Sequence, residues 1–256
     1  KTILMKVIVL SSGSKGNTTY IETQTTKILI DIGNTCKYIT EKLSTIGVTL
    51  GEINAILITH THTDHIKGLK TFTNNYSAPI YITEKMHPKI PYVKQYKYIE
   101  SSLITIRDIK INIIKTSHDA EDSVGYIINN NDKSIVYITD TGYINKKYHP
   151  MLSNRDIYIM ESNHDVEMLN NGPYPFPLRQ RILSDKGHLS NHDSAKYIGD
   201  FIGPKTTNIV LAHLSHENNT PELAKETLLA KLQELNMTQI HIDIALQDQE
   251  TEIIQV

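Results

Sequence analysis

The sequence predicts an α/β fold in which residues 1–256 form one domain. Short runs rich in isoleucine, threonine and tyrosine alternate with segments of helical length, a pattern typical of sheets covered by helices. Six of the expected strands lead into Asp, Glu or His, and the ligand sites of α/β proteins gather at such strand ends. No repeat, low-complexity tract or linker divides the sequence.

The expected strands are short apolar runs bounded by polar turn residues. In chain order they are Lys6–Leu10, Thr18–Glu22, Lys27–Asp31, Ile53–Thr59, Leu103–Ile106, Lys110–Lys115, Val124–Asn129, Ser134–Thr139, Asp156–Met160, Thr207–Ala212, Gln239–Ile244 and Glu250–Val256. The two pairs of strands between residues 103 and 139 are expected to form β-hairpins, the second of them closed by a turn at residues 130–132.

Four segments have the signals of helices. They are Lys37–Ile46, the end of Pro173–Leu183, Asn191–Ile202 and Pro221–Leu235. Gly47 is expected to end the first helix, and Asn191 is the expected N-terminal cap of the third. The fourth has the strongest signal, because Thr220 can cap it and Pro221 suits the first helical position.

The composition excludes several classes of protein. No apolar stretch reaches the roughly 20 residues that span a bilayer, and no apolar segment with a cleavage site marks a signal peptide. The single Cys36 excludes an internal disulfide, so we expect a cytoplasmic protein with no membrane partner. A net charge of −2 lacks the basic surplus typical of proteins that bind long nucleic acids. Arg179, Arg181 and Lys186 form a candidate phosphate-binding group, with a solvated helix face as the alternative.

The most informative motif is His60–His65, with the sequence His-Thr-His-Thr-Asp-His, which follows an apolar strand. In a regular strand His60, His62 and Asp64 would share one face, and His65 would point to the other. The chain must therefore turn within the motif, and a turn can direct two sets of ligands at two adjacent points. Histidine accounts for only 12 of 256 residues, so three histidines within this short motif indicate a metal site rather than a polar surface loop.

Two metal ions need about three protein ligands beyond the four of this motif, including a carboxylate that bridges the ions. His118, Asp140 and His213 are the natural candidates, because each comes just after an expected strand. Imidazole and carboxylate ligands suit zinc, and also manganese, nickel or iron. We therefore expect two divalent ions per chain, with zinc or manganese favoured.

The motif His60–His65 is preceded by Asp31 and followed by His118, Asp140 and His213. This arrangement resembles the sequence motifs of the metallo-β-lactamase superfamily. The resemblance covers residues 31–213 and implies a four-layer αββα sandwich with the metals at one edge of two sheets. The implied ligands of one metal are His60, His62 and His118, and those of the other are Asp64, His65 and His213. Asp140 would bridge the two metals, and Asp31 would orient the ligand loop without touching either.

Further segments narrow the resemblance to the YycJ/WalJ-like branch, a relative of ribonuclease Z. They are Ser12–Asn17, Glu161–Asp165, Gly187–Asn191 and Leu211–Ser215. The branch implies hydrolysis of phosphodiesters, with DNA exonuclease activity attributed to close relatives. By the same resemblance, His188 would contact the scissile phosphate and protonate the leaving oxygen, and Glu161 would orient His188. Together with Asp64, these are the expected catalytic residues.

We therefore predict a metal-dependent phosphodiesterase, a nuclease of exonuclease type that uses a metal-bound hydroxide at a dinuclear centre. Its substrate would be a phosphodiester in DNA or RNA. The near-neutral charge keeps a cyclic-nucleotide phosphodiesterase with the same centre as the alternative. Hydrolysis of β-lactams or thioesters is less favoured, because His188 and Glu161 indicate phosphate chemistry.

Two rival classes and the oligomeric state complete the expectations. A redox di-iron protein is disfavoured by His62, since such relatives generally carry Glu there. A non-catalytic scaffold is disfavoured by the complete ligand set. The sequence leaves the oligomeric state open, with a homodimer as one option.

Overall fold

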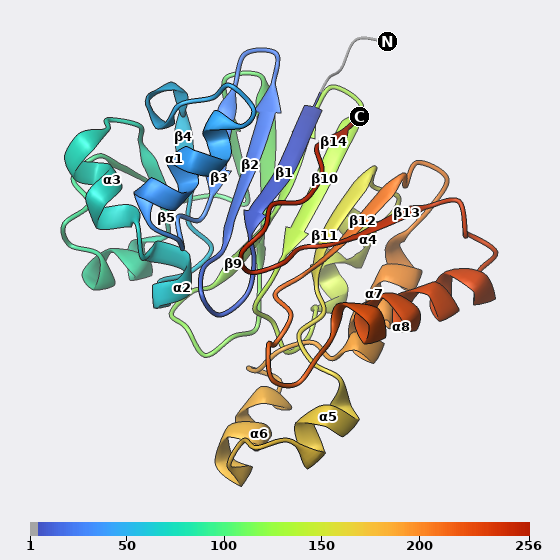
Figure 1. Cartoon of the computed structure of the whole chain (residues 1–256). Helices are drawn as coiled ribbons and strands as arrows, with labels where there is room; N and C mark the ends of the chain where they lie inside the picture. The colour runs from blue at the N-terminus through green and yellow to red at the C-terminus, as the bar shows by residue number, and fades with distance from the viewer. Residues whose placement is uncertain (1–4) are drawn as a thin grey trace.

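The structure is a computed structural model that describes residues 5–256, and its architecture is the expected αββα sandwich. Two seven-stranded sheets lie face to face, and helices cover their outer faces (Figure 1). Each sheet is antiparallel in one half and parallel in the other. Because parallel neighbours end at the same edge, the loops that follow them are brought together.

The first sheet has the strand order β14-β1-β2-β3-β4-β5-β6. Its strands are β1 (Met5–Ser11), β2 (Thr18–Thr23), β3 (Lys27–Ile30), β4 (Ala55–Leu57), β5 (Ile80–Ile82), β6 (Tyr96–Tyr98) and β14 (Ile254–Gln255). The second sheet has the order β13-β12-β11-β10-β9-β8-β7. Its strands are β7 (Leu103–Ile106), β8 (Ile109–Lys115), β9 (Val124–Asn130), β10 (Lys133–Ile138), β11 (Ile157–Glu161), β12 (Asn208–Ala212) and β13 (His241–Ile244).

The helices divide between the two outer faces and one edge (Figure 1). Beside the first sheet are α1 (Cys36–Ser44), α2 (Thr63–Ile66) and α3 (Leu69–Asn75), and beside the second are α4 (His149–Leu152), α7 (Asn191–Phe201) and α8 (Pro221–Glu234). The short helices α5 (Val166–Asn171) and α6 (Phe176–Ile182) project from the lower edge in this view. Short 3-10 helices occur at Leu50–Glu52, Glu84–Lys89 and Lys146–Tyr148. Among residues 5–256, no helix is long and apolar enough to cross a membrane.

Aliphatic side chains join the two sheets into one core. Ile28 and Ile30 of β3 belong to the same buried cluster as Ile111 and Ile128 of the second sheet. Each such side chain stabilises the fold by roughly 1.5–3 kcal/mol when fully buried. The core extends to the site, since Tyr126 Oη of β9 donates to the carbonyl of Ile58, 2.5 Å away and two residues before His60. The second sheet therefore supports a ligand loop of the first.

Most expected elements are confirmed, including both hairpins and a helix that begins at Pro221 with Thr220 as its cap. Asn191 was the wrong cap, because the Ser190 side chain accepts the hydrogen bond from Asp193 N. The expected strand Glu250–Val256 is reduced to Ile254–Gln255. Before it, Thr251 Oγ1 accepts a bond from Val9 N at 3.1 Å, so a side chain replaces the regular ladder.

Candidate metal centre

The candidate site lies where loops leave the carboxyl ends of strands from both sheets. Asp31 directly follows β3, Asp140 comes shortly after β10, and His213 directly follows β12. These three residues have backbone φ angles of 59°, 54° and 57°. This left-handed conformation is uncommon for residues other than glycine and is typical of strained positions at functional sites. Left-handed backbone turns therefore occur at three of the strand ends where the polar side chains converge.

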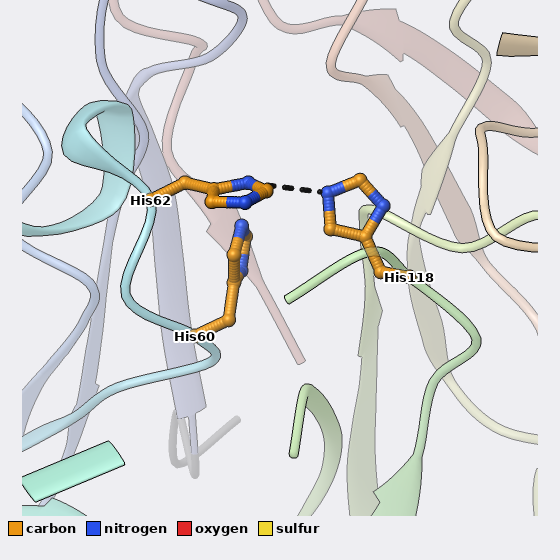
Figure 2. Close-up of side chains that lie close together, drawn as sticks. All are labelled: His60, His62 and His118. Atoms are coloured by element: carbon orange, nitrogen blue, oxygen red, sulfur yellow. Dashed lines mark hydrogen bonds between the residues drawn. The ribbon is translucent and has the colours of Figure 1, made fainter. Parts of the chain in front are cut away.

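Three histidines form a first cluster, shown in Figure 2. His60 and His62 come from the loop after β4, and His118 comes from the loop after β8. Their ligand nitrogens lie within 4.8 Å of one another, and His62 Nδ1 is 3.3 Å from His118 Nε2. Among the described residues, the buried His60 Nε2 atom has no hydrogen-bond partner. The three rings thus direct nitrogen atoms into one small space.

Asp64, His65 and His213 form a second cluster. Asp64 Oδ2 lies 3.4 Å from His65 Nε2 and 3.5 Å from His213 Nε2. Asp140 adjoins both clusters: its Oδ2 is 3.1 Å from His65 Nε2, and its Oδ1 is 3.7 Å from His118 Nε2. The Asp140 carboxylate is therefore placed to contact two ions at once.

The distances between these atoms fit metal ligands. Bonds of about 2.0–2.2 Å in a tetrahedral site place neighbouring ligand atoms roughly 3.3–3.6 Å apart. His65 Nδ1 lies 2.6 Å from Asp31 Oδ2 and can donate to it, which leaves the lone pair of Nε2 directed at Asp140. Buried acceptors that face one another are unfavourable unless a cation or proton lies between them. The two clusters could therefore hold two divalent cations.

A layer of hydrogen bonds holds the second cluster in place. Asp31 Oδ1 accepts from Thr59 N at 2.8 Å, and Asp31 Oδ2 accepts from Thr59 Oγ1 at 2.7 Å. Asn17, in the turn between β1 and β2, donates from Nδ2 to Asp64 Oδ2 at 3.2 Å. The backbone of Asn17 also donates to the Asp64 carbonyl at 2.8 Å. Partners of this kind fix the orientation of metal ligands.

His188 and Glu161 form a hydrogen-bonded pair next to the clusters. His188 Nδ1 is 2.7 Å from Glu161 Oε1 and 3.6 Å from Asp140 Oδ1. The buried Glu161 Oε2 accepts from Thr141 N and from Leu189 N, each at 3.1 Å, so the carboxylate is fixed. Burial opposes a proton on His188, but the Glu161 carboxylate raises the pKa of His188 above its ordinary value.

The charges at the centre suit metal ligands. Burial, together with the neighbouring His65, holds the pKa of His60 well below its ordinary value, so this imidazole is neutral. Burial opposes ionisation of Asp140, but His213 and His65 hold the pKa of Asp140 well below its usual range. Bound cations would supply the positive charge that protonated His65 and His213 otherwise provide.

The structure brings together all the residues that were expected at the site. They are Asp31, His60, His62, Asp64, His65, His118, Asp140, Glu161, His188 and His213. The candidate phosphate group is divided: Arg181 pairs with Asp119 beside His118, whereas Arg179 donates to the carbonyl of Asn170. No described contact joins Lys186 to the site.

Three supporting residues were not assigned a role from the sequence. Thr59 and Asp119 adjoin the motif histidines, and Asn17 lies far from them in sequence. Asp119 Oδ1 is 3.4 Å from His118 Nε2. Adjacency to a ligand could have identified Thr59 and Asp119. The segment Ser12–Asn17 signals a turn of glycine and serine and contributes to the family resemblance, but the contact of Asn17 with Asp64 required the structure.

Comparisons with known proteins agree with this geometry. Residues 26–214 match the model described as the Beta-lactamase superfamily domain. The chain is 37% identical over 233 residues to exodeoxyribonuclease YycJ of Bacillus anthracis, and the match covers 88% of each of the two chains. It is 40% identical over 241 residues to exodeoxyribonuclease WalJ of Streptococcus pneumoniae, and this match covers 91% of this chain and 90% of the relative. The crystal structure of YhfI from Bacillus subtilis, a metallo-beta-lactamase fold protein, has a TM-score of 0.74 at 19% identity and covers 98% of this chain and 99% of that one.

The family match spans most of the chain, and both relatives match it almost from end to end. The resemblance that was inferred from residues 31–213 is therefore confirmed. The chain belongs to the beta-lactamase superfamily, as a metallo-hydrolase of the YycJ/WalJ-like branch.

Proposed function

We propose that this metallo-hydrolase is a phosphodiesterase that degrades DNA as a nuclease of exonuclease type. Two relatives named exodeoxyribonucleases match the chain over most of its length. The paired His188 and Glu161 beside the candidate metal ligands support the same conclusion. Both lines of support concern the class of reaction.

In this proposal the clusters hold two divalent ions, with zinc or manganese expected. His60, His62 and His118 would hold one ion, and Asp64, His65 and His213 the other. Asp140 would contact both, because its carboxylate lies 3.1 Å from His65 Nε2 of the second cluster and 3.7 Å from His118 Nε2 of the first. When bound, such ions lower the pKa of water and neutralise charge on a phosphate group.

The His188–Glu161 pair is the observation that carries the proposal. Hydrolysis of an unactivated phosphodiester needs a proton on the leaving oxygen, and a positioned acid contributes about 10²–10⁴-fold. With Nδ1 of His188 directed at Glu161, Nε2 is the atom that can donate this proton. Glu161 keeps the ring in place through its own bonds to two backbone amides.

Asp64 is the proposed acceptor of a proton from the attacking water. Its Oδ2 atom faces His65 and His213, and Asn17 Nδ2 donates to the same oxygen and holds the carboxylate in place. A carboxylate in this position can orient the water and share its proton. Asp64 would then act on the attacking water of the in-line displacement. His188, oriented by Glu161, would act on the leaving oxygen.

A cyclic-nucleotide phosphodiesterase is the second candidate. The cavity beside His188, with a volume of about 560 Å³, could hold a single nucleotide, and the net charge of −2 lacks a long basic track. The same clusters and the same His188 would serve this reaction. The candidates differ only in whether the substrate continues beyond the cavity.

A screen with the metal-loaded protein tests the function. The substrates are bis-p-nitrophenyl phosphate, single-stranded and duplex DNA, RNA, cyclic nucleotides and a β-lactam. We expect hydrolysis of bis-p-nitrophenyl phosphate and release of nucleotides from DNA. Preferential turnover of cyclic nucleotides would favour the second candidate, and hydrolysis of the β-lactam alone would overturn both.

Three expectations from the sequence stay predictions. A cytoplasmic location fits a DNA substrate and the lone Cys36. A single domain over residues 1–256 and a homodimer are testable by limited proteolysis and by sedimentation.

A further inference from the structure

A cavity of about 560 Å³ lies directly beside His188 and His213. It is bounded by the turn between β1 and β2, by α6 and by the loop that follows β12. The histidines of the first cluster are not among its lining residues, so the cavity opens on the side of the second cluster and of the proposed acid. Whatever occupies it must therefore lie next to the leaving oxygen.

The two walls of this cavity differ in chemistry. Leu178 and Ile182, four residues apart on α6, share one helix face, and Tyr174 precedes them by four more residues. This wall is apolar and aromatic. The opposite wall carries Ser14 and Lys15 from the β1–β2 turn, in addition to the polar loop after β12. A ligand with one flat apolar part and one anionic part would satisfy both walls.

Two cationic side chains, Lys15 and Arg181, line the cavity. The Lys15 ammonium is 3.8 Å from Asp248, but their side chains are 62% and 77% exposed, and such exposed pairs contribute little. Arg181 lines the cavity and pairs with Asp119, which itself lies against His118. The arginine therefore extends from α6 towards the first cluster, across the space between the cavity and that cluster.

The Lys15 wall is held in a fixed position relative to the metal ligands. Gly13 has a φ of +119°, which glycine tolerates, and its N–H donates to Asn17 Oδ1 at 2.8 Å. Asn17 is bonded to Asp64 as described above. A Cβ on Gly33 would lie 1.8 Å from the Asp64 carbonyl, so the turn, Gly33 and the ligand loop are in close contact. Pre-organisation of this kind is what a binding subsite requires.

We propose that this cavity is a subsite for one unstacked nucleotide of a DNA strand, on the leaving-group side of the scissile phosphate. Tyr174 would stack on the base, and Lys15 and Arg181 would contact flanking phosphates. The inference rests on the proposed phosphodiesterase function, and it adds that the substrate enters as a single strand. An unstacked base exposes its π-face to an aromatic side chain, which gives a favourable contact for every base. An aromatic platform with a cationic wall is how single strands are bound without sequence preference.

Binding measurements test this subsite apart from turnover. The probe is a fluorescein-labelled hexathymidylate with phosphorothioate linkages, which resists hydrolysis, and thymidine 5′-monophosphate serves as the competitor. Tyr174→Ala should weaken binding about tenfold, because one base loses its stacking partner, whereas Tyr174→Phe should stay within about twofold. Lys15→Ala should weaken binding and reduce the slope of log K against log salt by about 0.7.

Lys110→Ala is the matched control, because Lys110 is an exposed lysine near the end of β8 remote from His118. Circular dichroism establishes that each variant is folded. The subsite is overturned if folded Tyr174→Ala and Lys15→Ala bind the probe as tightly as the parent, or if a duplex of equal length competes better than the single strand. A parent protein that binds the probe but cleaves no phosphodiester would refute the proposed function instead.

Discussion

The two ligand clusters differ in how firmly the protein holds them. In the first cluster the His62 side chain is 36% exposed, and its nearest carboxylate, Asp119, is 3.8 Å away. In the second, His65 is fully buried and bonded to Asp31. Asn163 adds a bond of 2.9 Å to the backbone of His213. The second cluster is pre-organised, whereas the first depends on a side chain that solvent can reach.

This contrast implies that the two proposed ions bind with different affinities and exchange at different rates. A rigid, buried ligand set loses little freedom when an ion binds, so the second cluster should bind its ion more tightly. The first cluster should fill later and exchange faster. The variants below test this difference, in order of decreasing expected effect.

Asp140→Ala should have the largest effect, because Asp140 adjoins both clusters. We expect loss of ions from both and loss of detectable hydrolysis, measured by elemental analysis and by DNA degradation. Asp132→Ala, in the exposed turn between β9 and β10, is the control. Retention of two ions by the Asp140 variant would contradict the bridging position.

His188→Ala should leave both ions in place and lower kcat on DNA by about 10²–10⁴-fold, since the proton donor is removed. Steady-state kinetics and ion content are measured on the same sample. His192→Ala, exposed on the first turn of α7, is the control and should behave as the parent. A DNA turnover equal to that of the parent would remove His188 from the mechanism.

Asp31→Asn should separate the two clusters. The substitution weakens the direct partner of His65, and it reaches the first cluster only through Thr59, whose Oγ1 bonds to Asp31 and lies 3.1 Å from His60 Nδ1. The affinity for the more tightly bound ion should therefore fall about 10–100-fold, and more than that of the other ion. Competition with a chromophoric chelator measures both affinities. If the two affinities fall equally, the assignment of the tighter ion to the second cluster is wrong.

Asn17→Ala should have the smallest effect. It removes the bonds from Asn17 Nδ2 to the Asp64 carboxylate at 3.2 Å and to the Asp64 carbonyl at 3.3 Å. The bond to the ligand carboxylate is worth about 1 kcal/mol, so ion affinity at the second cluster should fall roughly fivefold. The same chelator assay applies. Asn74→Ala, which changes a residue that lines a separate cavity, is the control. An equal loss of ion affinity in this variant would indicate a general effect on stability.

The side chains that were predicted to lie together do so, because they follow strands that are strongly apolar. His60, Asp140 and His213 each come after an isoleucine- or valine-rich run, and such runs specify a buried strand by composition alone. The positions of the ligands were thus fixed by local pattern. The resemblance to a known superfamily then related them to one another.

Other features depended on contacts that no local pattern contains. The strands β5 and β6 are three residues each and were not predicted, because such short runs resemble loops. Asn17 lies 47 residues from Asp64, and only the folded chain brings them together. The cavity between Tyr174 and Lys15 likewise brings together segments that are far apart in the sequence.

Titration of the metal-free protein with Mn²⁺, with DNA hydrolysis followed at each addition, tests the central claim most directly. We expect two ions per chain, tight binding of the first, and hydrolysis that rises with the second. Saturation at one ion, or full binding of two ions without hydrolysis of DNA, would contradict the account.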